Sequence, residues 1–387
     1  MSVLRPLAMT VLLASCGPGR AKAPPEESLA LPSDTLTAGW GNLPTAAPLG
    51  PGRWAVISSD FDVAVIADFN DRSITPLGGV KQKAYLHPSF VFTVGDTIYL
   101  DDWGRRRATV WTGDGRLIDS IPAPDALRGS LPRARDAAGQ LYFEVAPPPG
   151  RDGGGNRDSA AIVRAPKALS LFDTVARLSP LDLKEVDREN SRRYEPMVFS
   201  GKDLWGVWPD GTIWIARLLR NQIVTRDASG KVTRGPELPD PVYEVTQADR
   251  ERYLQGFPAD VRPKETDLPW ALIHPPFLAA IVQPGSAIWL EKSKPALDSV
   301  RRIHVVDRQG NLQRVFRLTG AARLIAAGAD RLLVAEQFAG GVRLMQVRIP
   351  VRIALRPHHP PRPTHRQPER AAGRAPAWPG PRRTSAG

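Results

Sequence analysis

The sequence predicts an all-β protein, a six-bladed β-propeller with short helical insertions. Three features support this fold class: a recurring glycine turn followed by alternating apolar residues, several Asp/Gly hairpin turns, and a high content of turn-forming residues. The chain has 33 glycines and 39 prolines among 387 residues, which suits many short strands joined by turns. Hydrophobic residues make up 42% of the chain, so a packed core can form.

The glycine turn recurs six times, and each copy precedes a short run of apolar residues in strand-like alternation. The six glycines are Gly52, Gly95, Gly139, Gly211, Gly285 and Gly328. Their spacings are 43, 44, 72, 74 and 43 residues, so we infer one repeated unit with insertions in two copies. A period near 43 residues is typical of a four-stranded propeller blade, and six copies predict six blades.

The second half of several units reads as a strand, a tight turn and a strand. Three such segments are residues 110–118, 224–232 and 305–312, and in each an Asp precedes a Gly across the turn. We expect them to form the outer two strands of blades two, four and five. Calcium binding would need several converging carboxylates, and each loop has only one or two, so a structural role is favoured.

Insertions account for the two long spacings. Residues 147–156 are rich in proline and glycine and predict an irregular excursion between strands. Residues 181–194 are charged and compatible with a short helix. Residues 246–254 begin with a threonine and predict one or two capped helical turns.

The N-terminus resembles a bacterial lipoprotein signal. A positively charged start at residues 1–5 precedes an apolar run at residues 7–13, which is too short to span a bilayer permanently. The tetrad Leu-Ala-Ser-Cys at residues 13–16 resembles the lipobox. This resemblance implies cleavage before Cys16, lipidation of its thiol, and an exported protein anchored to the cell envelope. The alternative is an ordinary secreted protein with a chance cysteine.

These observations divide the chain into four predicted segments: a signal peptide at 1–15, a flexible tether at 16–32, the propeller at 33–350 and a disordered Pro/Arg-rich tail at 351–387. The formal charge is +12, and most of it comes from the tail, which has no apolar periodicity. We therefore expect no nucleic-acid partner. A tail that binds envelope polyanions, or one that is a frame-shifted end of the gene, remains an alternative.

Two further segments resemble bacterial six-bladed propellers of the TolB-like or NHL-like type. The first is an X-Pro-x-Phe start at residues 87–90 followed by Gly-Asp-Thr-Ile-Tyr-Leu-Asp-Asp at 95–102. The second is the helical insertion before residues 268–277 with Gly-Ser-Ala-Ile-Trp-Leu at 285–290. The resemblance covers residues 31–350 and implies the fold of such lipoproteins. Related propellers include lactonase-like hydrolases with a metal on the axis, which is an analogy of fold only.

The common catalytic motifs are missing from the sequence. It has no Gly-x-Ser-x-Gly elbow, no His-Glu-x-x-His, no P-loop and no dinucleotide fingerprint. Cys16 is the only cysteine, which excludes an intrachain disulfide and thiolate-rich metal sites. We expect a binding module for a protein, peptide or glycan ligand rather than an enzyme. A metal-dependent lactonase-like hydrolase that uses the axial pocket is the alternative.

Two histidines occupy the same place in their units. His87 and His274 each precede a proline just before an innermost strand, and Glu195 precedes a proline in the fourth unit. The hypothesis is that these three side chains line one axial pocket that binds a divalent metal or an anionic ligand. Because the second and fifth of six blades are opposed, each histidine could instead only cap a strand. No cofactor is therefore predicted firmly.

Most of the ten tryptophans fall in strand-like runs, where bulky aromatic rings fill the space between blades. Trp103 and Trp270 lie in predicted loops and are the candidates for exposed aromatic contacts. Asp101 and Asp102 follow a predicted strand, and paired carboxylates can perform acid–base chemistry. A second carboxylate pair from another blade would be needed, so we expect a structural role for these two residues.

Overall fold

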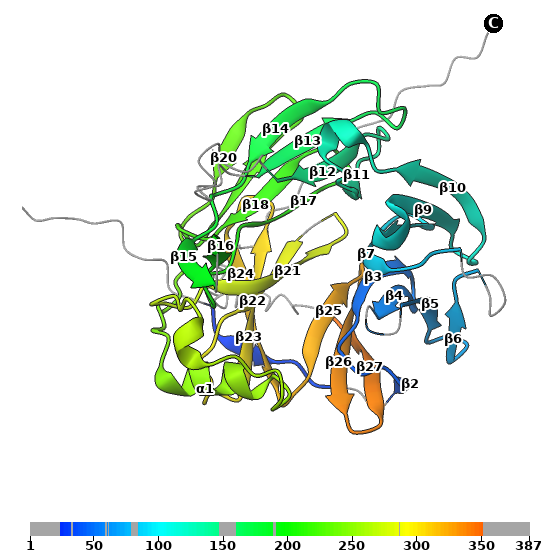
Figure 1. Ribbon diagram of the computed structural model, residues 1–387. Helices are drawn as coiled ribbons and strands as arrows, with labels where there is room; N and C mark the ends of the chain where they lie inside the picture. The colour runs from blue at the N-terminus through cyan, green and yellow to red at the C-terminus, as the bar shows by residue number, and fades with distance from the viewer. Residues whose placement is uncertain are drawn as a thin grey trace, which may run out of the picture. The chain divides into compact units, whose positions relative to one another are not determined.

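A computed structural model describes residues 24–350, with gaps at 32–33, 59, 61, 79–83, 147–159, 189–190 and 286. The chain divides into two compact units, Met1–Ile349 and Pro350–Gly387, and the structure described below belongs to the first. Six small sheets of this unit are arranged around an axis as a six-bladed β-propeller, which confirms the predicted fold class (Figure 1). The predicted signal peptide, Cys16 and the predicted tail lie outside the described residues.

The first four blades each consist of four antiparallel strands that follow chain order from the axis outward. They are β3–β6 (Thr45–Gly50, Arg53–Ser58, Val63–Asp68, Ser73–Pro76), β7–β10 (Pro88–Val94, Thr97–Asp102, Arg107–Thr112, Leu117–Pro122), β11–β14 (Pro132–Arg135, Leu141–Val145, Ala161–Ala165, Asp173–Arg177) and β17–β20 (Leu204–Val207, Ile213–Arg217, Gln222–Arg226, Val232–Arg234). The innermost strands of neighbouring blades contact one another around the axis.

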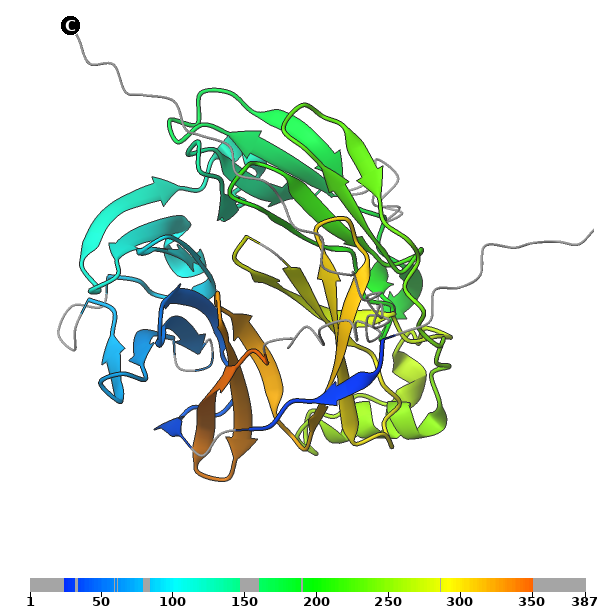
Figure 2. The same cartoon turned by 180° about the vertical axis from the view of Figure 1, so that it is seen from behind.

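The last two blades combine both ends of the described chain. They are β21–β24 (Phe277–Gln283, Ala287–Lys292, Val300–Asp307, Leu312–Thr319) with β1 (Glu26–Ser28), and β25–β27 (Arg323–Ala327, Arg331–Phe338, Gly341–Arg348) with β2 (Thr35–Ala38). β2 is the outermost strand of the sixth blade and pairs antiparallel with β27, so it closes the ring. Figure 2 shows this blue N-terminal segment beside the two blades.

Residues 24–31, the described part of the predicted flexible tether at 16–32, are ordered by contacts with the propeller. β1 pairs in parallel with β24, and Leu29 is buried between the fifth and sixth blades. Glu26 and Glu27 form ion pairs with arginines of β23 and β24. Three residues are too few for a recognisable strand pattern. The order of β1 comes instead from its pairing with β24, which is distant in the sequence, and from the ion pairs of its two glutamates.

The repeated glycines lie in the turns between the first and second strands of the six blades, as the repeat predicts. At Gly52 the backbone is left-handed, with φ at 76°, and a Cβ atom would lie 2.6 Å from the side chain of Asn70. Glycine is required there for both reasons. The predicted outer hairpins are confirmed as β9–β10, β19–β20 and β23–β24.

Of the two insertions predicted to be helical, one forms strands and the other forms a helix. The possible helix at 181–194 is wrong: this stretch forms an antiparallel pair of strands, β15 (Leu183–Arg188) and β16 (Ser191–Pro196). It lacks the apolar period of a helix. The helix expected at 246–254 is confirmed as α1 (Gln247–Gln255), with Thr246 and Asp249 forming a capping box.

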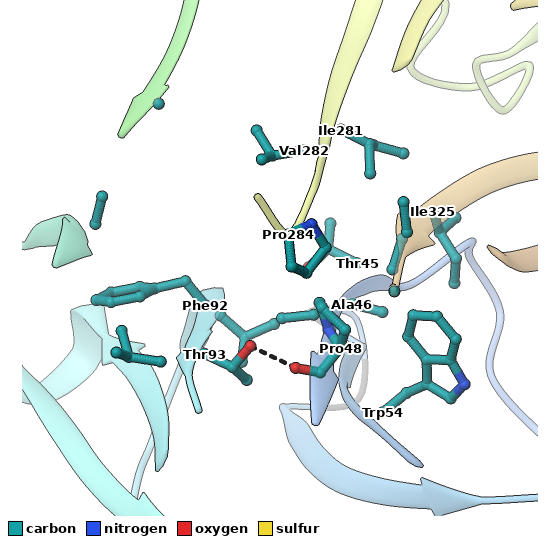
Figure 3. Close-up of a pocket in the computed structure, with 18 of the residues that line it drawn as sticks. Thr45, Ala46, Pro48, Trp54, Phe92, Thr93, Ile281, Val282, Pro284 and Ile325 are labelled. Carbon is teal, nitrogen blue, oxygen red and sulfur yellow. Dashed lines mark hydrogen bonds between the residues drawn. The ribbon is translucent and has the colours of Figure 1, made fainter. Parts of the chain in front are cut away.

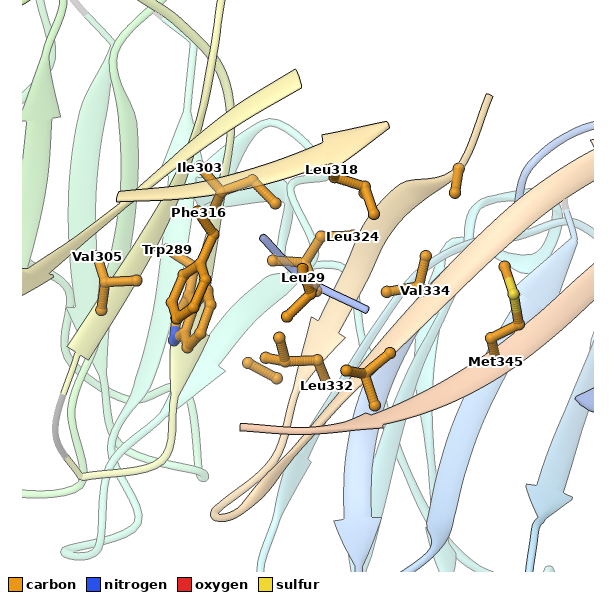
Figure 4. Packing of buried hydrophobic residues seen from close by; sticks show 13 residues of the cluster. Leu29, Trp289, Ile303, Val305, Phe316, Leu318, Leu324, Leu332, Val334 and Met345 are labelled. Atoms are coloured by element: carbon orange, nitrogen blue, oxygen red, sulfur yellow. The ribbon is translucent and has the colours of Figure 1, made fainter. Parts of the chain in front are cut away.

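The core lies between adjacent blades rather than on the axis. Figure 4 shows the cluster between the fifth and sixth blades, where Trp289 stacks on Phe316 with ring centroids 5.3 Å apart. Five tryptophans are fully buried: Trp54, Trp111, Trp208, Trp214 and Trp289. Three 3₁₀ turns complete the described elements: η1 (Trp103–Arg105), η2 (Asp125–Leu127) and η3 (Glu265–Asp267). No helix within the described ranges is long and apolar enough to cross a membrane.

Candidate functional site

A cavity of about 870 Å³ lies where the six innermost strands meet. Its lining includes side chains from β3, β7, β11, β17, β21 and β25, and from the turns that follow these strands. Figure 3 shows Pro48, Phe92, Ile281 and Ile325 around this shared space. Because most lining side chains are apolar or aromatic, the cavity offers a largely apolar surface near the axis.

Contacts between neighbouring blades hold the lining in place. The Thr93 hydroxyl donates a hydrogen bond to the Pro48 carbonyl, which joins the second blade to the first (Figure 3). The Trp205 indole nitrogen, on the fourth blade, donates to a carboxylate oxygen of Glu144 on the third blade, at 2.7 Å. Side chains fixed by such bonds give the cavity a defined shape, as expected of a preformed binding site.

Five of the residues that line the cavity carry a charge. They are Arg133, Arg135, Arg323, Asp330 and Arg331. The lining therefore carries four arginines and one aspartate, and Asp330 lies 3.7 Å from Arg331. The lining as a whole is positively charged.

Two buried acids occupy equivalent positions on the second and fifth blades. Asp101 on β8 pairs with Phe90 of the innermost strand, and Glu291 on β22 pairs with Ala279. In both blades the pair follows directly after a shift in strand register. The matching motifs Ile-Tyr-Leu-Asp and Ile-Trp-Leu-Glu encode this equivalence in the sequence.

Each buried acid supports an arginine of the next blade. Asp101 lies 3.6 Å from the guanidinium of Arg133 on β11, and Glu291 lies 3.2 Å from that of Arg323 on β25. Both arginines line the cavity, and they come from the third and sixth blades, which are opposed in a ring of six. The two carboxylates are behind the lining and are not part of it.

Asp101 and Asp102 have different roles, although they are adjacent. Asp101 is fully buried, and neither of its carboxylate oxygens has a hydrogen bond within the described part of the chain. Burial raises the pKa of Asp101 to about 7, and the nearby charge of Arg133 acts in the opposite direction. Asp102 accepts hydrogen bonds from the backbone N–H groups of Leu86 and His87, both at 3.0 Å, so it fixes the chain before β7.

The structure does not bring together His87, Glu195 and His274. The His87 ring is half exposed and lies 2.8 Å from a carboxylate oxygen of Asp62. His274 is buried and lies 3.3 Å from a carboxylate oxygen of Asp249. Glu195 lies on β16, outside the six blades. None of the three lines the central cavity.

The position of the prolines explains this separation. On β7 the cavity is lined by residues 90–95, whereas His87 precedes the strand; on β21 it is lined within 279–285, whereas His274 precedes the strand. The histidines are thus at the opposite strand ends from the glycine turns. Across the residues that the structure describes, no group of three or more His, Cys, Asp or Glu side chains could hold a metal ion.

The two candidate tryptophans have different surroundings. Trp103 lies in η1 with 62% of its surface exposed, so its role as a ligand contact stays a prediction. Trp270 is half-buried, because it packs against Phe199 and Tyr253 next to α1. Its indole nitrogen donates to the carbonyl of Glu265 at 2.9 Å. Trp270 is therefore only partly exposed, and its role as a ligand contact stays a prediction.

The fold and the cavity together define a six-bladed propeller with a preformed cavity between its innermost strands. No protein-family model matches the chain, and no curated protein matches it. Several solved structures are similar in outline. A putative exported protein from Bacteroides fragilis has a TM-score of 0.48 and 10% identity, over 84% of this chain and 99% of that one.

Two other similar structures have assigned names. Virginiamycin B lyase from Staphylococcus aureus has a TM-score of 0.43 and 10% identity, over 82% of this chain and 99% of that one. A calcium-binding regucalcin from Agrobacterium tumefaciens has a TM-score of 0.41 and 10% identity, over 83% and 95%. Similarity at this level transfers neither activity nor ligand, and the TolB-like or NHL-like type stays a prediction.

Proposed function

We propose that the protein is a ligand-binding module of the cell envelope, and that its ligand occupies the central cavity. The observation that carries this proposal is the cavity itself, at about 870 Å³. Pockets for small molecules measure roughly 300–1,000 Å³ and are lined by apolar side chains with a few placed polar groups. The central cavity has this size and this kind of lining, which favours a small apolar molecule or a peptide segment over a glycan.

Export and anchoring belong to the same proposal, and they rest on the sequence of residues 1–16. A lipidated Cys16 would tether the propeller to a membrane through acyl chains. Replacing Cys16 with alanine is expected to move the protein from the membrane fraction to the soluble fraction of its native host. An unchanged distribution, with no added acyl mass on Cys16 in the natural protein, would exclude the anchor.

The metal-dependent hydrolase has less support. Such a site needs imidazoles or carboxylates that converge on one ion. Among the described residues that line the cavity, Asp330 is the acid and histidine is missing. The Asp330 side chain is 72% exposed and lies beside Arg331. Because the described lining brings no such group of imidazoles or carboxylates together, binding is the function we propose.

The experiment blocks the cavity with two indole rings. Thr45 and Ala279 line the cavity from the first and fifth blades, and both become tryptophan in one variant. The control places tryptophans at Thr75 and Thr233, which are exposed on the outermost strands β6 and β20. Each full-length protein is incubated with an extract of the native envelope and re-isolated, and the bound molecules are identified by mass spectrometry.

We expect the natural protein and the control variant to retain the same molecule, and the cavity variant to lose most of it. Thermal unfolding of all three proteins shows whether they remain folded. Equal retention by the cavity variant and the control would contradict the proposal, because the ligand would then bind elsewhere.

A further inference from the structure

The charge of the central cavity gives information about the ligand. Of its four arginines, Arg331 lies beside Asp330 and also donates to Gln346. Arg135 donates to the Tyr99 hydroxyl at 2.5 Å. These two guanidinium groups are therefore already engaged near the cavity. The other two arginines of the lining are Arg133 and Arg323.

Arg133 and Arg323 are held on one side only. Their side chains are 41% and 37% exposed, and each lies beside a buried acid of the preceding blade. A guanidinium carries five N–H donors in a planar fork, so a single carboxylate behind it leaves donors for a second anion. No hydrogen bond joins the Arg133 guanidinium to Asp101, because the nearest carboxylate oxygen is 3.6 Å away.

The surroundings of these arginines are apolar. Arg133 lies over the ring of Phe90, 4.5 Å from its centroid, and Phe92, Trp205 and Ile281 also line the cavity. Such walls favour a molecule with an apolar body, because burying apolar surface is favourable. An arginine in an apolar cavity also strengthens its interaction with an anion, since water competes less there.

We infer that the cavity binds an apolar molecule that ends in one carboxylate, and that Arg133 or Arg323, which line the cavity from opposed blades, binds this group. This inference rests on the proposed function, in which the cavity is the ligand site. The apolar chain lies against the aromatic and aliphatic lining. A fatty acid and the free C-terminus of an apolar peptide share this chemistry.

The probes are decanoate below its micelle concentration, decanol as the neutral analogue, and a capped apolar tripeptide with a free carboxylate. Binding to the full chain is measured by calorimetry for four variants: Arg133→Gln, Arg323→Gln, the double variant, and Arg301→Gln as the control. Arg301 contacts the same Glu291 at 2.9 Å but does not line the cavity. Arg133→Lys keeps the charge without the planar fork, and far-UV circular dichroism checks the fold of every variant.

We expect at least one of the two carboxylate probes to bind, and whichever binds identifies an acyl or a peptide source. Substitution of the arginine that binds the carboxylate should weaken binding by about ten-fold, and the double variant should lose at least as much, as for other charge-assisted hydrogen bonds. The Arg301→Gln variant should bind like the natural protein. Decanol should bind more weakly than decanoate and should not respond to the arginine substitutions.

Two results would overturn the inference. If neither carboxylate binds, or if binding is the same in the double arginine variant, the cavity does not select an anion through these residues. If the envelope molecule retained by the natural protein is neutral, the inference also fails, although loss of that molecule in the tryptophan-blocked variant would still support the proposed function. Retention by the blocked variant would instead contradict the proposed function itself.

Discussion

Asp101 is the residue at which burial and charge conflict most clearly. Its pKa is raised from 3.8 to about 7 by burial, so the folded protein keeps a proton that the unfolded chain releases. The folded state therefore binds more protons than the unfolded state between about pH 4 and pH 7, and the free energy of unfolding falls as pH rises through this window. Above about pH 7 Asp101 is ionised in both states, so it no longer changes the free energy of unfolding with pH.

Replacing Asp101 with asparagine removes this titration. The variant should gain stability relative to the natural protein as pH rises from 4 to 7, by up to about 4 kcal/mol. Urea unfolding of both proteins at pH 4.5, 6 and 7.5 measures the difference. A difference that does not change with pH would show that Asp101 is ionised in the folded protein at all three values.

The site residues were only partly predictable from the sequence. The structural role expected for Asp101 agrees with its burial. The arginine beside it, Arg133, is 32 residues further along the chain, and no local motif marks it. Asp101 and Glu291 each end the same sequence pattern, an Ile, an aromatic residue, a Leu and an acid. This repeated pattern is the sequence signal that could have pointed to the neighbouring arginines, Arg133 and Arg323. The prolines that follow His87 and His274 mark the strand ends opposite the glycine turns, so they do not indicate the cavity lining.

At the scale of elements, β1 shows how a short segment gains order from the rest of the fold. It has three residues and lies on the open edge of β24, and its main apolar anchor is Leu29, which is 4% exposed. The Leu29→Ala substitution should lower the free energy of unfolding by about 2–4 kcal/mol, because it leaves a cavity between the fifth and sixth blades. Urea unfolding measures this change.

Leu31→Ala is the matched control, since Leu31 is 38% exposed and lies two residues further along the chain. It should change the free energy of unfolding by less than about 0.5 kcal/mol. Equal effects of the two substitutions would mean that β1 does not pack as described.

The elements that were predicted correctly are those defined by local chemistry. Glycine turns and Asp/Gly hairpins specify backbone conformations that few other residues adopt, and they gave both the number of blades and three outer hairpins. The capped helix α1 follows the same logic. The β15–β16 hairpin and β1 were not predicted correctly, because their strand partners, rather than their own apolar pattern, determine their structure.

At the scale of the whole molecule, the described propeller depends on a strand from the N-terminal side. β2 completes the sixth blade, so its removal should leave the edge of β27 open and the ring unclosed. A chain that begins at residue 39 lacks β1 and β2 and should melt roughly 10 °C or more below a chain that begins at residue 24. Calorimetry compares the two truncations, and equal melting temperatures would contradict closure by β2.

The proposal that the central cavity is a binding site is tested most directly by a crystal structure of the full chain with the molecule recovered from the native envelope. The account predicts electron density for this molecule between the six innermost strands, in contact with the side chains that line the central cavity. Density on the outer strands, with the central cavity unchanged, would contradict it.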